Sequence, residues 1–171
     1  MTDETTFDFQ YGPGPVPAHQ HPYGGGWVAD SAFVADTVYV GPNAKVYGKA
    51  WVSGNVRIFD YARVFGDARV FNNARVYGHS HVYGDAYVSG NARISGNVCV
   101  SGDAQVFGDV LITGDAHIYG DAQVYERAWI SGDARIFGHS WVFGDAQVYG
   151  RVKIFGRSQV FGNALVSGNV R

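Results

Sequence analysis

Histidine, cysteine, arginine and lysine recur at a fixed interval of 18 residues in this chain. His81, Cys99 and His117 follow one another at that interval, and His79 lies two residues before the first of them. Imidazole nitrogen and thiolate sulfur are common zinc ligands in proteins. The same interval continues in both directions through cations: Lys45, Arg63, Arg135, Lys153 and Arg171. If residues 18 apart lie side by side, the chain carries potential zinc ligands inside a column of positive charge.

A second series, two residues later, is mostly aromatic and includes one serine: Tyr47, Phe65, Tyr83, Ser101, Tyr119, Phe137 and Phe155. Cations beside rings suit an anionic ligand that itself contains rings: a nucleotide, a nucleic-acid strand or an acidic polysaccharide. The alternative is that the cations are solvated tips resting on exposed rings. We predict a ligand-binding surface, the basic–aromatic face, at Lys45, Arg63, His81, His117, Arg135, Lys153, Tyr47, Phe65, Tyr83 and Tyr119.

The element that must position these residues is a six-residue unit repeated 24 times from Val28 to Arg171. Every unit opens with Val or Ile, has Ala, Val or Ser at its fifth place, and usually turns at Gly followed by Asp or Asn. Because side chains alternate along a strand, the fifth residue of one unit and the first of the next point inward together. Three units close one coil of 18 residues, and about eight coils stack at ~4.8 Å per rung.

The pattern [VI]-x-G-[DN]-[AVS]-x over residues 28–171 resembles the hexapeptide-repeat family. It is most similar to the "YGDARV" variant found in bacteria and phages without assigned activity. It departs from the family in one detail, because an aromatic residue or Ser usually separates the aliphatic residue from the glycine. The resemblance implies an all-β chain folded as a left-handed parallel β-helix, a triangular solenoid, that usually assembles as a homotrimer.

A second outward face carries many rings and a single charge, Arg69. A large uncharged aromatic strip tends to be covered by a partner. We therefore predict an oligomer interface, the aromatic strip, at Trp51, Phe71, Tyr87, Phe107, Tyr125, Trp141, Phe143 and Phe161. The third face begins with Arg57, Arg75 and Arg93 and then becomes largely uncharged.

The resemblance also brings acyltransferases and zinc carbonic anhydrases into consideration. The transferases have a projecting loop with a catalytic His, whereas no insertion interrupts the repeat here. His139 at a corner is the alternative general base. For zinc, His81 and His117 lie two rungs or ~9.6 Å apart, too far for one ion to bind both. We expect no catalytic residues, no metal and no cofactor.

The corner aspartates Asp67, Asp85, Asp103 and Asp121 also form a column. A row of carboxylates can hold Ca²⁺. Asp residues at such corners more often bond to N–H groups of their own turn.

Composition sets the remaining bounds. The 171 residues have a net charge of −2, which by itself indicates no nucleic-acid or membrane partner. The single cysteine excludes an intrachain disulfide framework, and the acidic start "MTDETTFDFQ" is unlike a signal peptide, so we expect a cytoplasmic protein. Residues 1–27 lack the repeat. We expect a flexible tail at 1–9 and an irregular cap at 10–27, with Trp27 over the top of the core of a domain spanning 28–171.

These features together predict a non-enzymatic, homo-oligomeric structural or binding protein. An uncovered end coil would also permit end-to-end assembly. Two alternatives are a phage-type protein that sequesters a ligand or nucleotide, and an acyltransferase-like enzyme of the hexapeptide-repeat family.

Overall fold

The computed structural model describes residues 5–10 and 14–168, and these form strands, turns and bends without a helix. The strands make three sheets. The first contains β1 (Thr6–Phe7), β2 (Val16–Gln20), β3 (Trp27–Ala29), β6 (Lys45–Val46), β9 (Arg63–Val64), β12 (His81–Val82), β15 (Cys99–Val100), β18 (His117–Ile118), β21 (Arg135–Ile136) and β24 (Lys153–Ile154). The second contains β4 (Phe33–Val34), β7 (Trp51–Val52), β10 (Arg69–Val70), β13 (Tyr87–Val88), β16 (Gln105–Gly108), β19 (Gln123–Glu126), β22 (Trp141–Val142) and β25 (Gln159–Val160). The third contains β5 (Tyr39–Val40), β8 (Arg57–Ile58), β11 (Arg75–Val76), β14 (Arg93–Ile94), β17 (Leu111–Ile112), β20 (Trp129–Ile130), β23 (Gln147–Gly150) and β26 (Leu165–Gly168).

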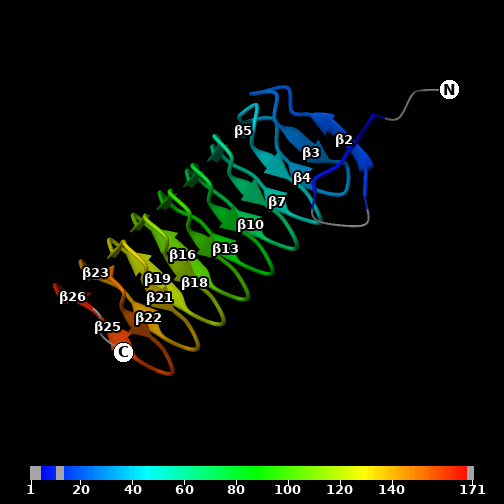
Figure 1. Cartoon of the computed structure of the whole chain (residues 1–171). Coiled ribbons are helices and arrows are strands. Elements are labelled where there is room, and N and C mark those ends of the chain that lie inside the picture. Colours follow the sequence, from blue (N-terminus) through cyan, green and yellow to red (C-terminus); the bar gives the residue numbers. More distant parts are fainter. Residues whose placement is uncertain (1–4, 11–13, 169–171) are drawn as a thin grey trace.

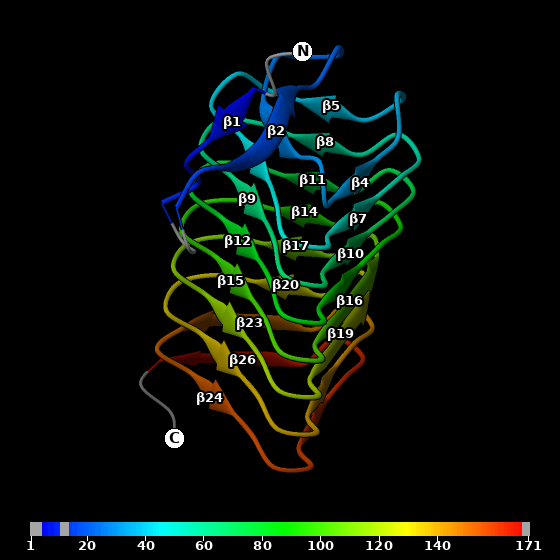
Figure 2. The ribbon, with the colours of Figure 1, turned by 90° about the vertical axis from the view of Figure 1, so that its right-hand side faces the viewer.

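From β3 onward each strand pairs in parallel with the strand one coil away, and paired residues are 18 apart in the sequence, as in His81 with Cys99 and Val82 with Val100. The chain is therefore a parallel β-solenoid of about eight coils, as the repeat predicts. The coils stack from β3 at one end of Figure 1 to β26 at the other. The three sheets fit a triangular cross-section (Figure 2).

The core is a continuous column of the residues that open the repeats and of the small residues before them. Val82, Val100 and Ile118 have no exposed surface, and neither has Ala116. Branched side chains suit the stacked strands, and the small residue leaves room for them at the centre of each coil. Two inward hydroxyls are also buried because they bond to the backbone: Ser80 donates to Tyr77 O at 2.8 Å and Ser140 to Phe137 O at 2.9 Å.

The corners stack as closely as the strands. Gly84 has a φ of 71°, and a Cβ placed there would lie 2.9 Å from the amide nitrogen of Gly102 one coil below. Glycine is therefore favoured by backbone conformation and by space. At another corner, Asn55, Asn73 and Asn91 form a chain of side-chain hydrogen bonds that ends on Asp109.

The N-terminal segment differs from the irregular cap and flexible tail that its composition predicts. Strand β2 pairs antiparallel with both β1 and β3, so the hairpin extends the first sheet beyond its first solenoid strand. An edge strand needs no six-residue period, which is why the repeat does not reveal it. Trp27 lies on the outer side of this sheet against Phe7, not over the core. Residues 1–4 of the predicted tail lie outside the described ranges.

In the described parts of the chain, no helix is long and apolar enough to cross a membrane.

Candidate functional site

The predicted cations of the basic–aromatic face lie side by side on the first sheet. Lys45 pairs with Arg63, Arg63 with His81, and Cys99 follows His81. The column continues through His117, Arg135 and Lys153. Arg171, the last member of the series, lies outside the described residues. The predicted adjacency is confirmed, whereas the binding role of the residues stays a prediction.

The aromatic residues of this face stack on one another. Tyr47 and Phe65 have ring centroids 4.8 Å apart with 1° between their planes, and Phe65 lies 4.9 Å from Tyr83 at 3°. Further down, Tyr119 stacks on Phe137 at 4.8 Å and Phe137 on Phe155 at 5.5 Å. Each ring inside a stack is thus covered on both faces by its neighbours. Only the ring edges remain for a ligand, and the residue pattern alone does not reveal this.

Ser101 interrupts the aromatic column between the two stacks. Within the described residues, Tyr83 stacks only on Phe65, and Tyr119 only on Phe137. The ring faces that Tyr83 and Tyr119 turn toward Ser101 therefore have no aromatic neighbour. The two rings are two rungs apart, ~9.6 Å, with Cys99 beside the gap and His81 and His117 above and below it.

The upper end of the face is covered by the N-terminal segment. The Phe9 ring stacks on Tyr47 at 4.8 Å, and Tyr47 is only 6% exposed. Lys45 Nζ lies 4.9 Å from the centre of the Phe7 ring. Lys45 and Tyr47, both predicted ligand-binding residues, therefore pack against the protein's own chain. A pocket of about 400 Å³ remains beside them, lined by Phe7, Gln10, Trp27, Pro42, Asn43, Ala44, Lys45, Tyr61 and Arg63.

Phe7 and Phe9 are the residues of this surface that the repeat cannot identify. They precede the first unit and follow no six-residue period. The one signal in the sequence is their alternation in "TFDFQ", which is typical of a strand with one apolar face.

Burial and neighbouring charge change the titration of the column. Partial burial, followed by the charges of Arg63 and His79, lowers the pKa of His81. Partial burial and then Arg63 lower the pKa of Lys45, while Asp8 acts in the opposite direction. Burial raises the pKa of the Cys99 thiol. These shifts favour a neutral imidazole and a neutral thiol beside the gap.

The possible metal ligands are spread along the solenoid. Among the residues that the structure describes, no group of three His, Cys, Asp or Glu side chains gathers to hold an ion. His79 lies at a corner and stacks on Tyr61 at 4.9 Å, away from the column of His81. Asp121, one of the corner carboxylates, is 3.2 Å from Nδ1 of His139.

The aromatic strip lies on the second sheet and combines exposed with stacked rings. Trp51 is 50% exposed, Trp141 39% and Phe161 58%. Phe107, Tyr125 and Phe143 form an unbroken stack at 4.9 Å per step. This face presents a row of large apolar side chains to its surroundings, as predicted for an interface, although no partner is present to identify what covers it.

Comparison with known proteins supports the repeat. A family model described as the YdcK beta solenoid repeat matches residues 62–78, 68–84 and 92–106. No curated protein and no solved structure matches the chain. The matched segments and the stacked parallel coils together make this a β-solenoid repeat protein.

Replacing Arg63 by Gln should raise the pKa of His81, because one of the charges that lower it is removed. The pKa should stay below its ordinary value, since burial is the larger cause. The measurement is an NMR titration of the His81 ring, with Arg93→Gln on the third sheet as control. An unchanged His81 pKa in Arg63→Gln would contradict this electrostatic account.

The same shift predicts how stability depends on pH. An unfolded chain has a histidine pKa of about 6.5. The folded value for His81 is lower, so the unfolded chain binds more protons as the pH falls below about 6.5. The stability contributed by His81 is therefore present above that pH, is lost as the pH falls through the interval, and changes no further below the folded pKa.

Proposed function

We propose that this β-solenoid is a non-enzymatic, homo-oligomeric binding protein whose basic–aromatic face holds an anionic ligand that contains rings. The observation that carries the proposal is the gap at Ser101 between two aromatic stacks, in the middle of a column of cations. Elsewhere in that column the rings cover one another.

The dimensions of the gap suit one planar ring. Tyr83 and Tyr119 are separated by two rungs, so a ring inserted between them lies ~4.8 Å from each. That spacing matches the 4.8 Å between Tyr119 and Phe137 within the lower stack. A ligand ring at Ser101 would therefore join the two stacks into one continuous column.

The charges flanking the gap supply the anionic half of the recognition. Arg63 and Arg135 lie two rungs above and two rungs below Cys99 in the cation column. Guanidinium groups bind phosphate oxygens through paired hydrogen bonds. A single-stranded nucleic acid, in which charges alternate with rings, can place one base at Ser101 and its flanking phosphates near Arg63 and Arg135.

The aromatic strip is the surface through which copies of the chain would associate. Its exposed tryptophans, Trp51 and Trp141, are the kind of side chain that anchors protein interfaces. The resemblance to hexapeptide-repeat proteins favours a homotrimer of left-handed, triangular solenoids. The three sheets and the 18-residue coil are compatible with that form.

Closing the gap should remove binding. Ser101→Tyr places a ring between Tyr83 and Tyr119, and we expect it to weaken binding of an oligothymidylate of about ten nucleotides by about tenfold. Fluorescence anisotropy of the labelled oligonucleotide measures the affinity. The melting temperature of Ser101→Tyr should not fall, because the added ring extends an existing stack.

The charge half of this proposal has its own variant and control. Arg63→Glu combined with Arg135→Glu should weaken binding and make its salt dependence shallower by about 1 in the log–log slope. Arg93→Glu, which changes the same charge on the third sheet, should leave most of the affinity. The proposal is wrong if Ser101→Tyr and the double variant bind the oligonucleotide as tightly as the parent protein.

The oligomer can be tested through one tryptophan. Trp141→Glu places a charge in the aromatic strip and should convert the oligomer to single chains in native mass spectrometry, because burying an unpaired charge is costly. Trp129→Glu on the third sheet is the matched control, since Trp129 is 46% exposed. A parent protein that is already a single chain, or equal masses for both variants, would refute the interface.

A further inference from the structure

A second interruption of an aromatic column lies on the third sheet, at Gly41. The pairing of Val40 with Ile58 places Gly41 one rung above Phe59, and the amide of Gly41 donates to Ile58 O at 2.8 Å. Phe59 in turn stacks on Tyr77 at 4.7 Å with 6° between the rings. Phe59 has no second stacking partner in the described residues, so the missing side chain at Gly41 leaves one face of its ring without an aromatic neighbour.

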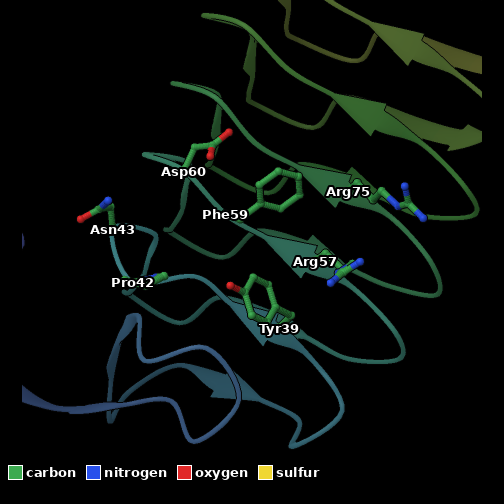
Figure 3. A pocket seen from close by; sticks show the side chains of 7 residues that line it. All are labelled: Tyr39, Pro42, Asn43, Arg57, Phe59, Asp60 and Arg75. Atoms are coloured by element: carbon green, nitrogen blue, oxygen red, sulfur yellow. The ribbon is translucent and has the colours of Figure 1, made fainter.

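This interruption coincides with a pocket of about 390 Å³, shown in Figure 3. Its lining residues are Tyr39, Pro42, Asn43, Arg57, Phe59, Asp60 and Arg75. The volume lies within the range of about 300–1,000 Å³ that is usual for small-molecule sites. In Figure 3 the rings of Tyr39 and Phe59 lie between two arginines on one side and Asn43 with Asp60 on the other.

The arginine side of the pocket is a local concentration of positive charge. Arg57 pairs with Arg75, and Arg75 with Arg93, so three guanidinium groups start from adjacent rungs. None of the three takes part in an ion pair with a described residue. The Arg57 guanidinium lies 5.3 Å from the centre of the Tyr39 ring, a cation–π contact that holds it at the pocket. Cations this close repel one another, and an anion bound between them removes that repulsion.

The opposite side offers hydrogen-bonding groups of both kinds. Asn43 carries an amide that donates and accepts, and Asp60 carries a carboxylate that accepts. Oδ2 of Asp60 accepts from the amide of Gly78 at 3.1 Å, which fixes the carboxylate at the rim of the pocket. These groups suit the edge of a heterocyclic base and disfavour a second phosphate on that side.

We propose that the pocket beneath Gly41 binds a nucleoside 5′-monophosphate. The base stacks on the open face of Phe59, its edge is directed to Asn43 and Asp60, and the phosphate is held by Arg57 and Arg75. Only one ring face is free and only one side is cationic, so the site takes a single nucleotide. The site lies on a different sheet from the gap at Ser101, so this proposal does not rest on the function proposed for the basic–aromatic face.

Calorimetric titration with adenosine 5′-monophosphate tests the site. The Ser101→Tyr protein serves as background, because its basic–aromatic face is closed, and it should bind one nucleotide per chain. Arg57→Gln, Arg75→Gln and Phe59→Leu should each weaken binding by about tenfold. Adenosine without phosphate, and inorganic phosphate without a base, should each bind far more weakly than the whole nucleotide.

Two control variants come from the same columns. Arg93→Gln removes the third guanidinium, which does not line the pocket, and should change the affinity less than about threefold. Tyr149→Leu removes an exposed ring from the lower end of the solenoid and should change nothing. The proposal is overturned if the nucleotide does not bind at millimolar concentration, if the pocket variants bind like the controls, or if adenosine or phosphate alone binds as tightly.

Discussion

The amide of Phe65 donates to the carbonyl of Val82 at 2.9 Å, and the same bond joins Tyr83 to Val100 and Ser101 to Ile118. Each of these bonds connects one coil to the next at a fixed offset along the chain. A shift of one residue would turn every inward valine outward and bring every outward cation or ring into the core. The burial of Val82, Val100 and Ile118 therefore opposes any change of offset, and the columns on the surface follow from it.

A repeat that stacks like on like produces surfaces whose aromatic faces are already used. The unbroken stack of Phe107, Tyr125 and Phe143 shows this on the second sheet, because each ring lies 4.9 Å from the next. A ligand ring can stack only where a small residue takes the place of an aromatic one. Ser101 and Gly41 are two such places, and both lie beside arginine columns. In this protein, departures from the repeat carry the chemistry that the regular part cannot perform.

The sequence predicts the arrangement of the solenoid well because its inward positions are so restricted. The pairing of His81 with Cys99 follows directly from their separation in the sequence. The hairpin of β1 and β2 was not predictable in this way, because Phe7 and Phe9 lie outside the repeat and reach Tyr47 only through tertiary packing. The same limit applies to the ligand site. Residue types placed rings beside cations, but only the stacking geometry shows that most of those ring faces are covered.

The account can be tested most directly by mapping amide chemical shifts in the isotope-labelled protein during a titration with adenosine 5′-monophosphate. It predicts shifts concentrated at the interruptions, at residues 39–43 and 57–60 and around Ser101. The amides of Phe107, Tyr125 and Phe143, where the aromatic column is continuous, should remain in place. Shifts along that continuous stack as large as those at Gly41 and Ser101 would contradict the claim that ligands enter where the repeat is broken.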